Sequence, residues 1–289
     1  MSDAKRCTHL TMERNISERP QDTSPKPSGA EEQPAGLRSP FLNKQTQEKA
    51  RAEVVPVIIG SPWKYYKSRY RLKCGYFFAV VTSTTSRLPR MIRSTAKPST
   101  AEQLQLLQHL RHPNIVESLE LYTCPQEGYF LVSEFLPTTV RHLCQAPIYP
   151  TEPELSSILY QVLTGIDFLL GSGLIYEQIS AANLLMSSTG EVKICDVERC
   201  TSGGDVSKLL GSFTRLMMKL MDKKKLEDSV PSLTRPGEWS TDAIDMFTAS
   251  VSASPVIELL GQPFLRKREQ KDLVWLVQFV LVRARHFPE

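Results

Sequence analysis

The sequence has little that would cross-link a chain or anchor it in a membrane. Its 289 residues include six cysteines, none of them in a C-x-x-C pair, so neither a disulfide framework nor a zinc-finger spacing is indicated. The longest apolar run, 273–282, is about half of the ~20 residues that span a bilayer. The N-terminus also lacks the apolar core of a secretory signal. We therefore expect an intracellular protein with reduced thiols and no membrane partner.

A strong excess of charge of one sign is also missing. The chain carries 35 basic and 31 acidic residues, a net charge of +4, and its basic runs at 222–228 and 266–271 are mixed with acidic or neutral polar residues. A nucleic-acid surface usually gathers basic residues on one element, so we expect protein partners and no nucleic acid.

Residues 1–52 are rich in proline, serine, glutamine, glutamate and lysine and show no apolar period, which predicts a disordered tail. Short runs of β-branched and aromatic residues follow and are typical of antiparallel strands. A capping box from Ser99 to Glu102 predicts one helix between these runs. Residues 83–98 match neither pattern. The predicted strands cover 53–60, 65–72, 75–82, 115–122 and 128–136, and the helix covers 99–110.

Beyond residue 137 the pattern becomes helical. A second capping box, from Thr151 to Glu154, opens a stretch with helical apolar spacing and glycines at its end. The sequence therefore predicts an α+β chain, with a small sheet first and a mostly helical part after it. The predicted helices cover 151–173 and about 205–222, 240–250, 256–260 and 270–285, and two short strands cover 183–186 and 191–195.

Four strings in this order resemble protein kinases: "HPNIV" at 112–116, "YFLVSEFLP" at 129–137, the segment 173–198 and "QPFL" at 262–265. The resemblance extends over roughly 54–287. The sequence is also similar to divergent kinase-like proteins of filamentous fungi. It implies a bilobal fold with an N-lobe over 53–137 and a C-lobe over 138–289. It also implies a hinge at Glu134 to Leu136, where a nucleotide would contact the chain.

The catalytic loop of kinases, H-R-D-x-x-x-x-N, falls on residues 176–183. Gln178 stands where the proton-accepting aspartate belongs, and Ser180 replaces the lysine that follows it. A glutamine amide cannot take up a hydroxyl proton as a base. The resemblance leaves Asn183 and Asp196, the aspartate of the D-F-G motif, as candidate metal ligands, while Glu198 replaces the glycine of that motif.

The phosphate-binding parts of the kinase sheet are also altered. Matching the V-A-I-K strand to "FAVV" puts Val81 at the lysine position, and its helical partner falls on Gln103. Arg93 is an alternative source of the positive charge. The glycine-rich loop is absent, since Gly60 and Gly75 are the only glycines in the first two strands and the turn beside them.

The segment that carries a kinase's switch site and peptide platform is largely deleted, because Asp205, which opens the next helix, follows Asp196 after only a few residues. Together these replacements predict a pseudokinase that acts as a binding, scaffolding or regulatory module with no cofactor. Two alternatives stay open: an ATP-dependent serine/threonine kinase with relocated catalytic groups, and a module that binds ATP and magnesium through Asn183 and Asp196 without turnover.

Overall fold

The computed structural model describes residues 54–74, 76–95, 108–125, 127–224 and 230–286. The chain separates into two units, Met1–Arg51 and Ala52–Glu289, and all described residues belong to the second. The predicted tail over 1–52, most of the predicted helix over 99–110 and the predicted site residue Gln103 lie outside the described residues. The lobe boundaries at 53–137 and 138–289 stay predictions.

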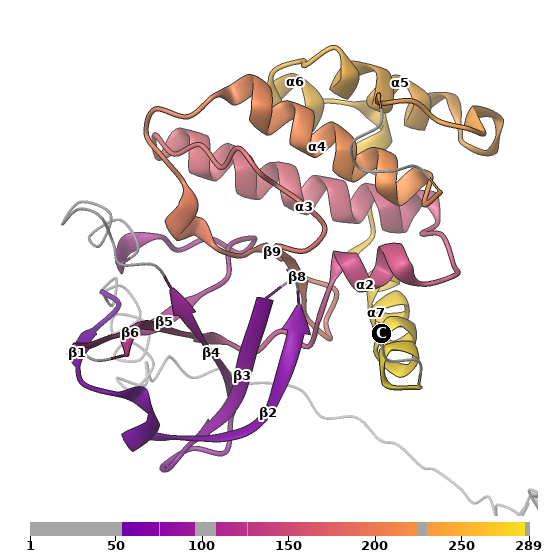
Figure 1. Cartoon of the computed structure of the whole chain (residues 1–289). Coiled ribbons are helices and arrows are strands. Elements are labelled where there is room, and N and C mark those ends of the chain that lie inside the picture. Colours follow the sequence, from indigo (N-terminus) through magenta and orange to yellow (C-terminus); the bar gives the residue numbers. More distant parts are fainter. Residues whose placement is uncertain (1–53, 75, 96–107, 126, 225–229, 287–289) are drawn as a thin grey trace, which may run out of the picture. The chain divides into compact units, whose positions relative to one another are not determined.

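The first half of the described unit is a six-stranded sheet in the order β1-β5-β6-β4-β3-β2 (Figure 1). β1 pairs with β5 in parallel, and the remaining neighbours are antiparallel. Five of the six strands fall on the runs that the sequence predicts. The strands are β1 (Val57–Ile59), β2 (Tyr66–Cys74), β3 (Tyr76–Ser83), β4 (Pro89–Thr95), β5 (Ser118–Cys124) and β6 (Gly128–Glu134).

Strand β4 lies within residues 83–98, for which no helix or strand is predicted. It is an inner strand that pairs with β3 and β6, and Arg90 lies opposite Val81. Successive side chains of a strand point to opposite faces. Met91 accordingly packs with an apolar cluster that reaches the helical region, whereas Ile92 packs with Val81 in a separate cluster within the sheet.

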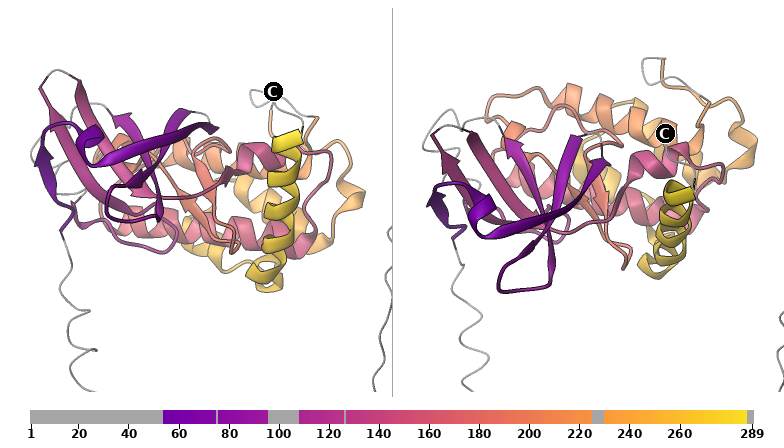
Figure 2. Two further views of the ribbon diagram at one scale, coloured as in Figure 1. Left: turned by 90° about the horizontal axis from the view of Figure 1, so that it is seen from below. Right: turned by 60° about the horizontal axis from the view of Figure 1, so that its bottom comes forward.

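The second half is helical (Figures 1 and 2). The Glu154 carboxylate accepts a 2.6 Å hydrogen bond from the Thr151 N–H, which confirms the predicted start of the long helix. The predicted arrangement of a sheet followed by a helical part, a kinase-like bilobal α+β fold, is confirmed. The helices are α2 (Val140–Gln145), α3 (Glu152–Gly171), α4 (Val206–Met221), α5 (Thr241–Val251), α6 (Val256–Leu260) and α7 (Gln270–His286), with short 3-10 turns η2 (Pro62–Lys64), η3 (Val197–Arg199), η4 (Pro236–Glu238) and η5 (Pro263–Lys267).

A three-stranded sheet in the order β7-β8-β9 lies next to the catalytic-loop region, with β7 (Thr138–Thr139), β8 (Leu184–Met186) and β9 (Val192–Ile194). α3 packs against β9, α6, α7 and η5, and α4 packs against α5. These contacts enclose the main apolar core, so the loop between α3 and β8 is mounted on fixed elements.

The apolar run at 273–282 lies within α7, as predicted. One face of this helix, with Leu273, Leu276 and Val277, is fully buried in the main core, whereas Trp275 and Val282 are exposed. The chain's own core therefore covers only part of the run. In the part of the chain that the structure describes, no helix is both long enough and apolar enough to cross a membrane.

Candidate functional site

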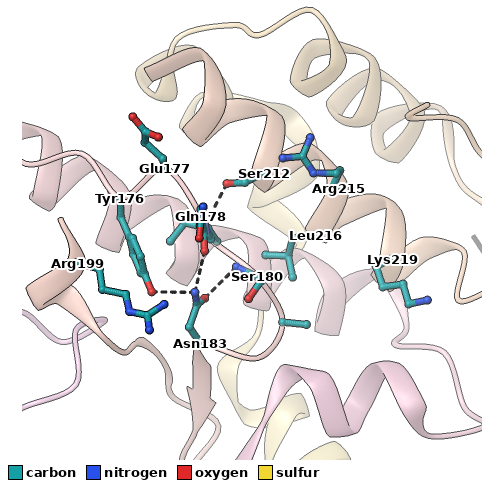
Figure 3. Close-up of a pocket in the computed structure, with 12 residues that line it drawn as sticks. Tyr176, Glu177, Gln178, Ser180, Asn183, Arg199, Ser212, Arg215, Leu216 and Lys219 are labelled. Carbon is teal, nitrogen blue, oxygen red and sulfur yellow. Dashed lines mark hydrogen bonds between the residues drawn. The ribbon is translucent and has the colours of Figure 1, made fainter. Parts of the chain in front are cut away.

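The loop between α3 and β8 is closed by the side chain of Asn183. Its amide nitrogen donates to the Tyr176 hydroxyl at 2.9 Å and to the Gln178 carbonyl at 2.8 Å, and its oxygen accepts from the Ser180 N–H at 2.9 Å (Figure 3). Tyr176 and Asn183 are buried. Both ends of the Asn183 amide are thus engaged within the loop, and this side chain fixes the loop's shape.

Gln178 and Ser180 lie in this loop, where the resemblance puts two catalytic groups. Gln178 is exposed and Ser180 is half-buried. The neighbouring carboxylate, Glu177, accepts a 2.7 Å hydrogen bond from the Asp205 N–H and lies 3.5 Å from the Lys208 ammonium. It is therefore held at the start of α4, and Figure 3 shows it pointing away from Asn183.

Asp196 follows β9 and is buried, with a left-handed backbone (φ 63°) that aspartate tolerates better than most residues. Its Oδ1 lies 3.3 Å from Arg93 Nη2 and accepts a 3.1 Å hydrogen bond from the Cys195 thiol. Burial raises the pKa of Cys195 well above its ordinary value, so the thiol stays protonated and can donate. Asp196 is thus tied to the sheet through Arg93.

Glu198 forms the strongest contact of the site. Its two oxygens accept hydrogen bonds from Arg93 Nη1 and Nη2 at 2.5 and 2.7 Å, and the Thr95 hydroxyl donates at 3.1 Å. The side chains of Arg93 and Glu198 are only 9% and 13% exposed. Burial alone would raise the pKa of Glu198, but the hydrogen bonds and charge of Arg93 more than offset this effect and hold that pKa below its ordinary value.

The assignment of Val81 to the lysine position does not fit this geometry. Val81 is fully buried in an apolar cluster within the sheet, and it is Arg93, on the next strand, that contacts Asp196. The physical reason is that strand β4 was not predicted. It lies between β3 and β6, so the strand that carries the cation near Asp196 is β4 and not β3, to which the sequence pattern assigned it.

The two predicted hinge residues have different surroundings. The Glu134 carboxylate accepts two hydrogen bonds from the Lys193 ammonium, each 2.9 Å long. Leu136 is fully buried in a cluster that joins the sheet to the helical region. The buried members of this junction cluster are Phe78, Met91, Val116, Leu136, Leu185 and Cys195.

A very small cavity lies beside Asp196. The cavity that Arg93, Ser133, Cys195 and Asp196 help to line has a volume of about 10 Å³. A cavity needs roughly 10–15 Å³ to admit one water molecule. This part of the site is therefore filled by side chains.

The short connection between Asp196 and Asp205 is anchored to the catalytic loop. Ile175 and Thr201 exchange two backbone hydrogen bonds of 2.9 and 3.1 Å. Gly204 lies so close to Ile175 that a Cβ at this glycine would approach the Ile175 side chain to 2.9 Å. The connection has neither the length nor the freedom to form a separate platform.

The candidate metal ligands do not form a ready site. Asn183 is engaged as described above, and one oxygen of Asp196 faces the Arg93 cation. The other Asp196 oxygen, Oδ2, is buried and has no hydrogen-bond partner in the described structure. Among the described residues, no three His, Cys, Asp or Glu side chains form a cluster that could hold a metal ion.

The pairing of Arg93 with Glu198 is the feature that sequence reasoning missed. The two residues are 105 positions apart, and no local pattern connects them. A signal was present in each residue alone: a cation in an unassigned stretch, and an acid where the D-F-G motif has glycine. Only the folded chain brings the two residues onto facing elements, β4 and η3.

Comparison with known proteins agrees with the fold. Residues 84–214 match the protein kinase domain. Over 131 residues, 41% of this chain, the sequence is 30% identical to the mitogen-activated protein kinases HOG1B of Wallemia ichthyophaga and sty1 of Schizosaccharomyces pombe, covering 35% and 37% of those proteins. It is 25% identical over 247 residues, 82% of this chain, to the serine/threonine-protein kinase SSN3 of Pyricularia oryzae, covering 47% of that protein.

The chain therefore spans between about a third and a half of the length of these relatives. The matched segment contains β4 with Arg93, the catalytic loop and the start of α4. The fold is kinase-like, and residues 84–214 are similar in sequence to the protein kinase domain and to these relatives.

Proposed function

We propose that this chain is a catalytically inactive kinase-fold protein, a pseudokinase, that acts as a binding, scaffolding or regulatory module. The observation that carries the proposal is the buried cluster of Arg93, Glu198 and Asp196. Among the described residues, the cation that contacts the D-F-G-like aspartate already makes a two-point contact with the acid two residues later. A phosphate group would have to compete with that acid for Arg93.

The catalytic loop supports the same proposal. Phosphoryl transfer to a hydroxyl needs a carboxylate that orients the hydroxyl and accepts its proton. Gln178 cannot supply this function, and the nearby carboxylate of Glu177 is held by the Asp205 N–H and points away. General-base catalysis typically contributes about 10²–10⁴ in rate, so its loss alone would leave a very slow enzyme.

The arrangement of the junction does not fit ATP with magnesium. The resemblance puts a nucleotide base at the hinge, where Leu136 is fully buried against the other members of the junction cluster. A base could enter only if these side chains separated. One oxygen of the candidate metal ligand Asp196 is already in contact with Arg93.

Two alternatives have an observation in their favour. The relatives named above are serine/threonine or mitogen-activated protein kinases, which favours an active kinase with relocated groups. The contact of Arg93 with Asp196 keeps a cation and an acid side by side, which favours a module that binds ATP and magnesium without turnover. In both alternatives Arg93, which is paired with Glu198, would also have to contact phosphate.

A thermal-shift titration of the full chain with ATP and magnesium tests the proposal. A ligand that binds only the folded state at 100 times its Kd adds about 2.7 kcal/mol, which raises the Tm of a chain of this size by several degrees. We expect no shift at millimolar nucleotide. A clear shift would favour the nucleotide-binding module.

Phosphate transfer is tested separately with labelled ATP and the purified full chain. We expect no incorporation into the chain itself or into a general protein substrate. Incorporation that is lost in Asp196→Ala but kept in Asp245→Ala, a substitution on α5 outside the site, would overturn the proposal in favour of an active kinase.

A further inference from the structure

A pocket of about 250 Å³ opens on the α4 side of the catalytic loop, away from the junction cluster. It lies between the loop residues and one face of α4, and η3 contributes to one side (Figure 3). No residue of the short connection 200–205 lines it. The lining residues are Tyr176, Glu177, Gln178, Ile179, Ser180, Ala181, Asn183, Arg199, Ser212, Arg215, Leu216 and Lys219.

The charge of this pocket is positive. Three of its lining residues are basic: Arg199 from η3, and Arg215 and Lys219 from α4. Arg215 and Lys219 are four residues apart, so they share one face of the helix, and Arg215 is exposed. The only acid among the lining residues is Glu177, which is held by the Asp205 N–H and by Lys208.

The arrangement of these cations indicates an extended anionic ligand. Figure 3 shows Arg199 on one side of Gln178 and shows Arg215 and Lys219 on the other. A peptide with one anionic side chain at Arg215 and an acidic neighbour near Arg199 can contact both sides. Guanidinium groups bind phosphate oxygens through two parallel hydrogen bonds, which makes a phosphate group the best match for Arg215.

The uncharged lining favours a peptide over a nucleotide. Its apolar members, Ile179, Ala181 and Leu216, are aliphatic and buried, so they offer little surface on which a base could stack. The single aromatic residue of the lining is Tyr176, which is buried and whose hydroxyl accepts from Asn183. It presents no open ring face for stacking with a base. The exposed Gln178 amide can hydrogen-bond a peptide backbone.

We propose that this pocket binds a phosphorylated peptide segment of a partner protein, with the phosphate at Arg215 and Lys219 and a flanking acidic residue toward Arg199. This inference rests on the proposed binding role, for which it names the chemistry of the partner. In the kinase fold, the deleted segment after Asp196 would add chain beside this loop. Its absence leaves the pocket open to a segment supplied from outside.

The test uses the full chain and a fluorescently labelled library of phosphoserine and phosphothreonine peptides with acidic flanks, measured by fluorescence anisotropy. We expect saturable binding by phosphopeptides and none by the same peptides without phosphate. Arg215→Glu should weaken binding by at least about tenfold, because it removes a charge-assisted contact and adds a like charge. Arg215→Gln should weaken it less and controls for any effect of charge reversal on folding.

Arg266→Glu is the matched control, because Arg266 is exposed in η5 and does not line the pocket. It should bind as the unchanged chain does. Equal losses in Arg215→Glu and Arg266→Glu would overturn the inference, since they would show non-specific attraction. Competition by inorganic phosphate or AMP at the peptide's own concentration would overturn the assignment to a peptide. Absence of any phosphopeptide binding would also overturn it, while leaving the ATP and phosphate-transfer tests of the proposed function untouched.

Discussion

Removal of the Arg93 charge should strongly destabilise the fold. In Arg93→Met the aliphatic stem is largely kept, but the carboxylates of Asp196 and Glu198, whose side chains are 2% and 13% exposed, lose their shared partner. Breaking a buried ion pair by removing one member typically costs about 3–5 kcal/mol. Glu198→Gln leaves Arg93 beside Asp196 and should cost less, about 1.5–3 kcal/mol, the range for a hydrogen bond to a charged group.

The contribution of Glu198 to stability should depend on pH in opposite directions in the unchanged chain and in Arg93→Met. In the unchanged chain the pKa of Glu198 is lowered on folding, so its contribution to stability is present above the ordinary pKa and is lost as the pH falls through the lowered one. In Arg93→Met, burial is the dominant remaining effect and should raise the pKa of Glu198. The stability deficit of this variant should therefore shrink as the pH falls from about 7 to about 5, because the carboxylate takes up a proton.

Urea denaturation of the full chain at several pH values measures these changes. The double variant Arg93→Met with Glu198→Met should be more stable than the sum of the single changes predicts, because neither partner is then left alone. Glu258→Gln, on an exposed residue of α6, is the matched control for Glu198→Gln. If Arg93→Met and Glu198→Gln both changed the free energy of unfolding by less than about 0.5 kcal/mol at every pH, the cluster would have no stabilising role and the reasoning would fail.

Four further substitutions test local packing and hydrogen bonding by the same denaturation assay. Gly165→Ala in α3 should destabilise the fold by about 1–3 kcal/mol because the new Cβ would lie 2.9 Å from the Ile194 side chain. Gly171→Ala has open space around the new Cβ and should be neutral or slightly stabilising. A larger loss of stability in Gly171→Ala than in Gly165→Ala would contradict the close packing at Gly165. Asn183→Ala should cost about 2–3 kcal/mol because three hydrogen bonds of the loop are lost, and an unchanged stability would show that the loop does not depend on them. Lys223→Met should cost about 1–3 kcal/mol, since three backbone carbonyls at the end of α2 and just beyond it lose their donor. An unchanged free energy of unfolding would mean that solvent replaces the ammonium.

Most of the helical half of the fold could be predicted from the sequence because its signals are local, but α2 lies outside every predicted helix. The capping box at Thr151 and the apolar period that follows it define α3, and the boundaries of α4 to α7 fall within a few residues of the predicted ones. Strand β4 could not be predicted in this way. It begins with Pro89, carries two arginines, and owes its position to β3 and β6 on either side.

The candidate site was predictable only in part for the same reason. Gln178, Ser180 and Asn183 lie in one loop and were found through a contiguous motif. The role of Arg93 depends on strand order, and its partner Glu198 belongs to an element 105 residues away. Without the position of strand β4, Arg93 cannot be distinguished from an arginine in an exposed loop.

The Arg93–Glu198 pair also determines how this protein can respond to a partner. It joins β4 to η3 across the junction between the sheet and the helical region, beside a cluster of buried apolar side chains. An ion pair between the two regions restricts their relative motion before a partner binds. The partner would therefore meet a preorganised surface, and association would cost little conformational entropy. Occupancy of such a module would follow the concentration and the modification state of the partner.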